Sequence, residues 1–375
     1  MIGKAFLFFV LHLSLPVHAF LVDELTIEEQ VGQLLMPCFL GETANEDAKY
    51  LIQNIQVGGI LYYNWTNGLS SPQQVRELSQ SLQDLAQANR LPIPLLLSVD
   101  QEGGVVSRLK GNGFTVFPGN RALAMMGDPT LAKQQAFAMG KEMQNVGISL
   151  NLAPVVDVDS NPNNPVISAR SFGKDVETVI TFAKKSLEGY REAGVATTLK
   201  HFPGHGDTDI DSHYALPIVN KSMQELQKTE LAPFAALAHD TEAIMTAHLL
   251  VPALDPDHCS TLSQKTLSYL REQIGFSGLI ISDSLTMDGL LQQTAGRIEE
   301  AAILAIQAGC DMLLFGGRRL QGSFDNHCLS TKEIQNIHIA LVSAVKNGDI
   351  PEERIHQAVE RVLQLKAGFK SQLVK

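Results

Sequence analysis

Eight short apolar runs, separated by segments of helical periodicity, constrain the fold of this 375-residue chain more than any other feature. Each run is short enough for a buried strand. The segments between them carry apolar residues at three- and four-residue spacing, which is typical of helices that pack one face against a sheet. We expect strands at residues 34–40, 58–62, 94–99, 150–156, 196–200, 243–249, 278–281 and 310–315.

The expected helices alternate with these strands. Thr26, with Glu29 three residues later, has the spacing of a helix cap and predicts a short helix over residues 25–33. Further helices are expected at residues 72–88, 130–146, 176–193, 221–238, 264–274, 297–308, 331–346 and 351–366.

Regular alternation of strand and helix predicts a parallel sheet, and eight strands favour its closure into a (β/α)8 barrel of the TIM type. An open doubly wound sheet is the alternative. It would normally carry a glycine-rich phosphate loop after the first strand, and Gly41-Glu42-Thr43 is not such a loop. Because no internal linker is evident, we interpret residues 20–375 as a single α/β domain.

Residues 1–19 have the features of a secretory signal peptide. Lys4 precedes a mostly apolar run over residues 5–15, and Val17-His18-Ala19 resembles a cleavage site with small residues. The run is too short to span a bilayer, and no later run is long and charge-free enough to do so. We therefore expect export to the periplasm or the medium. The alternative is an apolar segment or uncleaved anchor on a cytoplasmic protein.

The net charge of the chain narrows the classes of partner that its surface could bind. The formal net charge of −11 argues against a surface for nucleic acid or anionic lipid, since both require clustered cations.

The four cysteines show no CxxC pairing. Cys38 and Cys310 lie in apolar runs and are expected to be core thiols. Cys259 and Cys328 are the pair that could oxidise in an exported protein.

Charged residues gather where the expected strands end. Asp100 and Asp283 each end an otherwise apolar strand, where an unpaired charge would be costly, so we expect both to be functional. In a barrel the carboxyl ends of the strands meet at one mouth. Four more charged or titratable residues lie at these ends or in the loops that follow them, namely Arg108, Arg170, Lys200 and His201. For three other residues a structural role is at least as good an interpretation, namely turn formation or loop capping for Asp157 and Asp159 and hydrogen bonding for His248.

The stretch KHFPGHGDTDIDSH, residues 200–213, is unusually rich in titratable groups. Asp211 precedes His213 by two residues, so a tight loop can bring carboxylate and imidazole into contact, which favours the protonated ring. A metal site is the alternative. The histidines and aspartates of this stretch are irregularly spaced, the sequence has no HExxH motif, and Lys200 would repel a cation. We therefore expect neither a metal nor a cofactor.

Four motifs together resemble the β-N-acetylhexosaminidases of glycoside hydrolase family 3. They are SVDQEGG with Arg108 beyond it, NPVISARSFG, KHFPGHGDTDIDSH and ISDSLTM, and the opening LTIEEQVGQLLM is also similar. The resemblance covers the chain from about residue 25 onward, with the motifs in the family's order. It implies a (β/α)8 barrel and retaining hydrolysis of terminal β-linked N-acetylglucosamine, from peptidoglycan fragments or chitooligosaccharides.

The same resemblance implies a role for each matched residue. Asp283 would be the nucleophile of a covalent glycosyl-enzyme intermediate. His213 would be the acid/base, oriented and polarised by Asp211. The sugar hydroxyls and acetamido group would be held by Asp100, Arg108, Arg170, Lys200 and His201. A histidine acid is a departure from the usual pair of carboxyl groups. Two-domain relatives take this group from a second domain, for which the chain, ending at Lys375, leaves no room.

Two alternatives to this activity remain open. One is a related glycosidase, or a phosphorylase, with another sugar preference; Val105, Ser284 and Thr286 replace commoner residues and would act on subsite preference. The other is a non-catalytic carbohydrate-binding barrel, which is disfavoured because Asp283 and the Asp211–His213 pair are all present. Gly204 and Gly206 are expected to act as hinges for the loop that carries Asp211 and His213, which would close on the sugar and open again.

Overall fold

The computed structural model describes residues 22–316 and 328–368, so the expected signal peptide lies outside the described residues. Its eight main strands each fall on one of the predicted runs, which confirms all eight. They are β1 (Leu35–Pro37), β2 (Gly59–Tyr62), β3 (Leu96–Val99), β6 (Leu150–Asn151), β7 (Ala196–Phe202), β8 (Ala243–Thr246), β9 (Leu279–Ile281) and β10 (Leu313–Phe315).

The strands are parallel and close into a barrel, which confirms the predicted (β/α)8 class. Six of them form one sheet in the order β2-β3-β6-β7-β8-β9, and β1 pairs with β10. A parallel bridge between Ile281 and Met312 connects β9 to β10. On the other side of β1, the Gly58 amide donates to the Leu35 carbonyl at 3.0 Å. This closure rules out the open doubly wound sheet.

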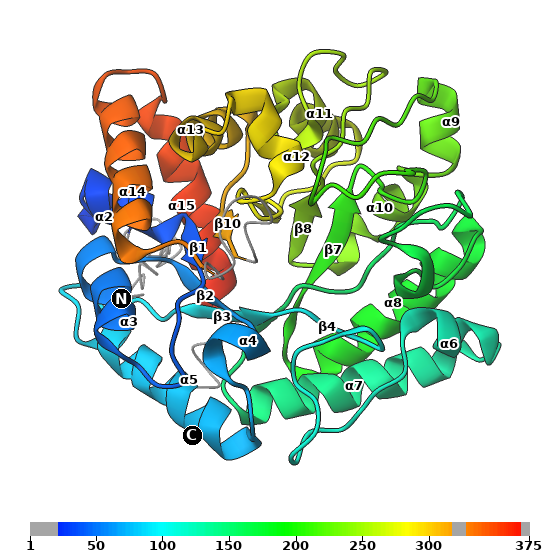
Figure 1. Cartoon of the computed structure of the whole chain (residues 1–375), viewed down its shortest axis with the longest axis horizontal. Helices are drawn as coiled ribbons and strands as arrows, with labels where there is room; N and C mark the ends of the chain where they lie inside the picture. Colours follow the sequence, from blue (N-terminus) through cyan, green and yellow to red (C-terminus); the bar gives the residue numbers. More distant parts are fainter. Residues whose placement is uncertain (1–21, 317–327, 369–375) are drawn as a thin grey trace, which may run out of the picture.

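Helices surround the strands, as Figure 1 shows. The longer ones are α5 (Pro72–Gln87), α7 (Pro129–Asn145), α8 (Val176–Ala193), α13 (Ile298–Ala308), α14 (Thr331–Lys346) and α15 (Glu352–Ala367). Helix α2 (Ile27–Gln33) begins at the predicted Thr26–Glu29 capping box. It packs against α14 and α15, so the first and last described helices complete the ring. Within the described ranges, none of these helices has the length and apolar character needed to cross a bilayer.

Two expected helices are less regular than the sequence predicts. The segment 221–238 forms two short helices, α9 (Met223–Lys228) and α10 (Ala232–Leu237). Thr229 leaves the helical region between them, with φ −125° and ψ −78°, and Glu230 turns inward to accept a 2.6 Å bond from Lys221. The segment 264–274 starts as α11 (Gln264–Ser268) and ends in a π-helical turn, Tyr269–Gln273.

The connections contain further short elements, including a hairpin that the sequence did not predict. Strands β4 (Gln101–Gly103) and β5 (Val106–Ser107) pair antiparallel directly after β3. Gly103 and Gly104 form its turn with φ of +89° and +61°, a region that favours glycine. The short helices are α3 (Glu46–Lys49), α4 (Asn64–Asn67), α6 (Asn120–Met125) and α12 (Asp288–Leu291).

The cysteine prediction is wrong in part. Cys38 is not a free core thiol but forms a disulfide with Cys328. Cys259, the other candidate for oxidation with Cys328, is a buried free thiol like Cys310. The reason is the pairing of β1 with β10: the Cys38 amide donates to the Phe315 carbonyl at 3.0 Å. Residues 290 positions apart in the sequence thereby lie 5.9 Å apart at their Cα atoms.

Candidate active site

All eight candidate residues line one cavity of about 450 Å³ at the carboxyl ends of the strands. Two of them belong to β7 itself, and the others lie in the segments that follow β3, β6, β7 and β9. The eight residues are Asp100, Arg108, Arg170, Lys200, His201, Asp211, His213 and Asp283. The structure therefore brings together every residue that the sequence singled out, while their chemical roles stay predictions.

A cluster of buried ion pairs forms one wall of the cavity. The Lys200 ammonium, only 2% exposed, lies 2.8 Å from Asp100 Oδ1 and 2.8 Å from Glu102 Oε1. Burial lowers the pKa of Lys200, but the Asp100 and Glu102 carboxylates outweigh burial and raise it overall. Arg108 Nη2 lies 3.7 Å from the second oxygen of Asp100. These ion pairs lie at the edge of the cavity, where Asp100, Arg108 and Lys200 can contact a bound ligand.

Glu102 is the functional residue that sequence reasoning missed. It accepts two bonds from Arg170, Nε to Oε2 at 2.9 Å and Nη2 to Oε1 at 2.8 Å. Burial raises the pKa of Glu102, but Arg170 and Lys200 outweigh burial and hold it well below its usual range. Its position in the DQEGG motif was visible, but its two cationic partners come from other strands, so no local signal identified it.

The unpredicted hairpin positions Arg108. The Gln101 side chain on β4 accepts from the Arg108 amide at 2.9 Å and the Leu109 amide at 3.0 Å. The Arg108 guanidinium lies over Trp65, 4.5 Å from the ring centroid. Trp65 in turn stacks on Tyr63, with centroids 4.4 Å apart. The two aromatic residues therefore give the cavity an apolar wall, which the sequence did not indicate.

Asp157 orients His201 from beneath. Asp157 Oδ2 lies 2.6 Å from His201 Nδ1, and Oδ1 accepts from the backbone amides of His201 and His205 at 3.1 and 2.7 Å. Arg170 Nη2 lies 3.3 Å from His201 Nε2. Both ring nitrogens of His201 are therefore held by neighbouring side chains, Nδ1 by Asp157 and Nε2 by Arg170. Asp157 thus caps the loop, as expected, and also orients the His201 ring.

Two other interpretations from the sequence are confirmed. Asp159 stabilises a loop, since it accepts a 2.7 Å bond from Arg121. His248 is a hydrogen-bonded residue at a strand end: its Nδ1 lies 2.8 Å from Thr261 Oγ1 and its Nε2 2.9 Å from the Ser284 carbonyl. Burial lowers the pKa of His248, although the nearby Asp283 carboxylate acts in the opposite direction.

Asp211 and His213 form a close pair at the mouth of the cavity. Asp211 Oδ1 lies 2.7 Å from His213 Nδ1 and accepts from the His213 amide at 2.9 Å. Burial lowers the pKa of His213, but the bond to Asp211 and the charge of Asp283 outweigh it, so the pKa is raised. The His213 side chain is 48% exposed. The raised pKa favours the protonated ring, the side chain is accessible, and its free nitrogen is Nε2.

Asp283 lies at the end of β9 in the same cavity. Its Oδ1 accepts from the Ser284 amide at 2.7 Å. Burial raises the pKa of Asp283, but the imidazoles of His248, His201 and His213, with that amide, outweigh burial and lower it. The carboxylate is therefore ionised at neutral pH and can act as a nucleophile.

The histidines of the 200–213 stretch are bound to protein groups rather than to each other. Among the described residues, no three His, Cys, Asp or Glu side chains are grouped as a metal ion would require. His201 contacts Asp157, His205 contacts Thr208 and Ser212, and His213 contacts Asp211. Asp211, His213 and Asp283 line the same cavity.

The sequence matches those of known proteins. Residues 26–365 match the Glycosyl hydrolase family 3 N terminal domain. The chain is 32% identical over 376 residues to "Beta-hexosaminidase A" of Pseudoalteromonas piscicida, covering 91% of this chain and 61% of that protein. It is 36% identical over 275 residues to a "Beta-hexosaminidase" of Pseudomonas aeruginosa, covering 72% of this chain and 79% of that protein.

A solved structure is similar over almost the whole chain. It is that of a glycoside hydrolase family 3 β-N-acetylglucosaminidase from Paenibacillus, with a TM-score of 0.85 and 42% identity. The match covers 92% of this chain but only 62% of the Paenibacillus chain, so the present chain corresponds to part of that larger protein.

Proposed function

Because the chain belongs to glycoside hydrolase family 3, we propose that it releases terminal β-linked N-acetylglucosamine from oligosaccharides by a retaining mechanism. One observation carries this proposal: Asp283, whose pKa is lowered, and the Asp211-bound His213, whose pKa is raised, line the same cavity. These are the nucleophile and the proton donor that retaining hydrolysis requires. The names of the similar hexosaminidases support N-acetylglucosamine as the sugar.

In the first step Asp283 attacks the anomeric carbon. Its carboxylate oxygen forms the new bond while the glycosidic bond breaks, and the leaving oxygen takes the proton from His213 Nε2. Nδ1 is held by Asp211 at 2.7 Å, so Nε2 is the nitrogen that faces the substrate. General acid assistance of this kind contributes about 10²–10⁴ in rate.

The second step reverses these roles. The neutral His213 takes a proton from water, whose oxygen attacks the anomeric carbon and displaces Asp283. Two inversions at the same carbon retain its configuration. Throughout, the Lys200, Asp100 and Arg170 cluster holds the sugar hydroxyls and the acetamido group, with Arg108 and His201 completing the set.

The protein is proposed to be exported and to act on fragments of peptidoglycan or on chitooligosaccharides. The Cys38–Cys328 disulfide supports export, because disulfides persist in oxidising compartments and are rare in the cytosol. Sequencing the N-terminus of the mature protein tests the cleavage of residues 1–19; a retained Met1 would contradict it.

A panel of aryl glycosides tests the activity. The aryl N-acetyl-β-glucosaminide should be cleaved much faster than the matched β-glucoside, and NMR should detect the β-anomer of N-acetylglucosamine as the first product. Initial release of the α-anomer would contradict retention. Repeating the assay with inorganic phosphate separates hydrolysis from phosphorolysis, which would give a sugar phosphate instead.

A further inference from the structure

A buried imidazole that the proposed mechanism does not use lies between the sugar-binding and acid/base parts of the 200–213 stretch. His205 is 2% exposed. Its Nδ1 lies 2.9 Å from Thr208 Oγ1, and its Nε2 lies 3.0 Å from Ser212 Oγ. Its backbone amide donates to Asp157 at 2.7 Å. The ring therefore connects the fixed base of the loop to the residue that separates Asp211 from His213.

The base of this loop is rigid. Asn164 Nδ2 donates to the His205 carbonyl at 2.8 Å and to Thr208 Oγ1 at 3.1 Å. Gly206 lies so close to Val158 that an added Cβ would be 1.7 Å from its carbonyl oxygen. Gly206 thus permits close backbone packing, a role different from the hinge expected of it. Any movement of the acid/base pair has to occur beyond Thr208.

Ser212 is also bound from the opposite side. Its carbonyl accepts from the Gly289 amide at 3.1 Å, and an added Cβ on Gly289 would lie 2.5 Å from that oxygen. Gly289 belongs to α12, which starts five residues after Asp283. Ser212 is therefore the junction between the loop that carries the acid/base pair and the segment that carries the nucleophile.

The ring of His205 is uncharged at neutral pH. Burial, and then the neighbouring His201 at a centroid distance of 6.0 Å, lower the pKa of His205 to about 4. Asp157 and Asp283 act in the opposite direction but do not reverse the shift. A neutral imidazole has one donor and one acceptor nitrogen, which suits a link between two hydroxyl groups.

We propose that His205 is a positioning residue: through Ser212 it holds the Asp211–His213 pair at the separation from Asp283 that proton transfer to the leaving group requires. The proposal rests on the proposed function. It predicts that loss of the His205–Ser212 contact impairs only the steps that need His213. Small displacements of a catalytic group cost about 10²-fold in rate.

The variant Ser212→Ala removes this contact without touching the titrating residues. Its kcat/KM should fall at least about tenfold for aryl N-acetyl-β-glucosaminides with poor leaving groups. The dinitrophenyl substrate, whose leaving group departs without a proton, should lose no more than about twofold. The parameter kcat/KM reports the first step alone, so slow hydrolysis of the intermediate does not obscure the comparison.

Two conservative variants give an independent readout. His205→Gln places an amide where Nε2 reaches Ser212, whereas His205→Asn can replace only the contact of Nδ1 with Thr208. The proposal predicts that the glutamine variant retains the wild-type dependence on the leaving group better than the asparagine variant. Ser79→Ala, which removes the buried 3.2 Å contact with Tyr62 outside the cavity, is the matched control and should leave this dependence unchanged.

Equal losses on both substrate classes for Ser212→Ala, or no loss, would overturn the proposal. The same holds if glutamine and asparagine at position 205 behave alike. These outcomes leave the proposed function intact, because the wild type remains active. A wild type that cleaves no aryl N-acetyl-β-glucosaminide would instead overturn the proposed function and the role of His205 with it.

Discussion

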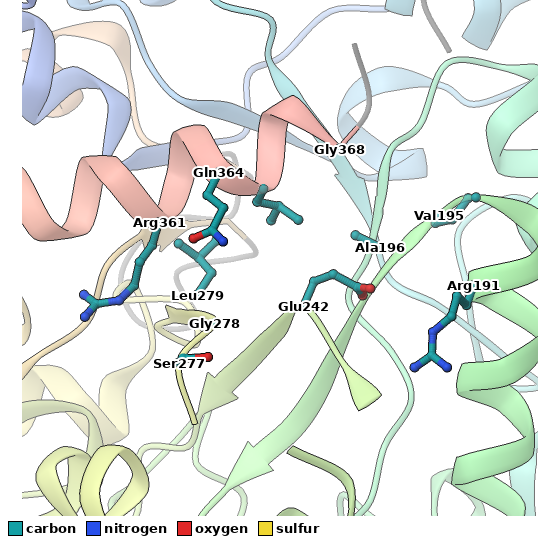
Figure 2. A pocket seen from close by; sticks show the side chains of 12 residues that line it. Arg191, Val195, Ala196, Glu242, Ser277, Gly278, Leu279, Arg361, Gln364 and Gly368 are labelled. Atoms are coloured by element: carbon teal, nitrogen blue, oxygen red, sulfur yellow. The ribbon is translucent and has the colours of Figure 1, made fainter. Parts of the chain in front are cut away.

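The two ends of the barrel carry cavities of nearly equal volume and different chemistry. The candidate active site, of about 450 Å³, opens at the carboxyl ends of the strands. The second, of about 460 Å³, lies at their amino ends, where Ala196 and Leu279 begin β7 and β9, and is bordered by Gln364 of α15. Figure 2 shows this second cavity, with Arg361 and Arg191 on opposite sides of it.

The charged groups of the second cavity are already bound to neighbouring residues. Arg191 donates to the Asp240 carbonyl at 2.8 Å, and Arg361 to Asp311 at 3.0 Å. Glu242 accepts from the Thr197 amide and hydroxyl at 2.9 and 3.0 Å.

At the opposite mouth the charges converge. Lys200 is shared by two carboxylates, and His213 is exposed with a raised pKa. Volume therefore does not identify the site of a reaction; converging groups with shifted pKa values at the carboxyl ends do.

The largest expected effect comes from Asp283→Ala. Removing the nucleophile should lower kcat for aryl N-acetyl-β-glucosaminides by more than about 10⁴-fold, because alanine cannot form the covalent intermediate. Release of the aryl chromophore measures it. Near-normal turnover by Asp283→Ala would contradict the assignment of the reaction to the cavity at the carboxyl ends of the strands.

His213→Ala should show a smaller and selective loss. Substrates with poor leaving groups should slow by about 10²–10⁴-fold, whereas activated ones need no proton in the first step and should slow far less in kcat/KM. If both classes slowed alike, His213 would not be the general acid.

The pH dependence of kcat/KM sharpens the comparison further. His213 must be protonated in the first step, and its pKa lies above its ordinary value of 6.5, so activity should persist above pH 6.5 and decline as pH passes that raised pKa. Asp211→Asn removes the main group that raises it, so the alkaline decline should move to lower pH. An unmoved decline would show that Asp211 does not set the pKa of His213.

The smallest effect is expected at the second cavity. Glu242→Gln weakens the charged acceptor of Thr197 and should lower the free energy of unfolding by about 1 kcal/mol. Activity should stay within about twofold of wild type, because Glu242 lies at the opposite end of the strands. Thermal unfolding and the aryl assay measure both. A tenfold loss of activity without unfolding would contradict the separation of the two ends.

What the sequence could predict depended on how far apart the contacting residues are. The eight strands were predictable because each is one continuous apolar run, and Asp211–His213 because they are two residues apart. Glu102 and Asp157 were not assigned their roles, because Lys200 and His201 contact them from other strands: His201 lies 44 residues beyond Asp157. The Cys38–Cys328 disulfide depends on the pairing of β1 with β10, which no local pattern reveals.

The central claim is that Asp283 forms a covalent intermediate, and trapping that intermediate tests it most directly. A ring-fluorinated N-acetylglucosaminyl fluoride should react with the enzyme to form a covalent intermediate that hydrolyses slowly. This intermediate should therefore accumulate on the wild-type enzyme. Peptide mass spectrometry should then locate one sugar on Asp283, and Asp283→Ala should remain unlabelled. Labelling of another residue, or rapid turnover of the reagent by Asp283→Ala, would contradict the account.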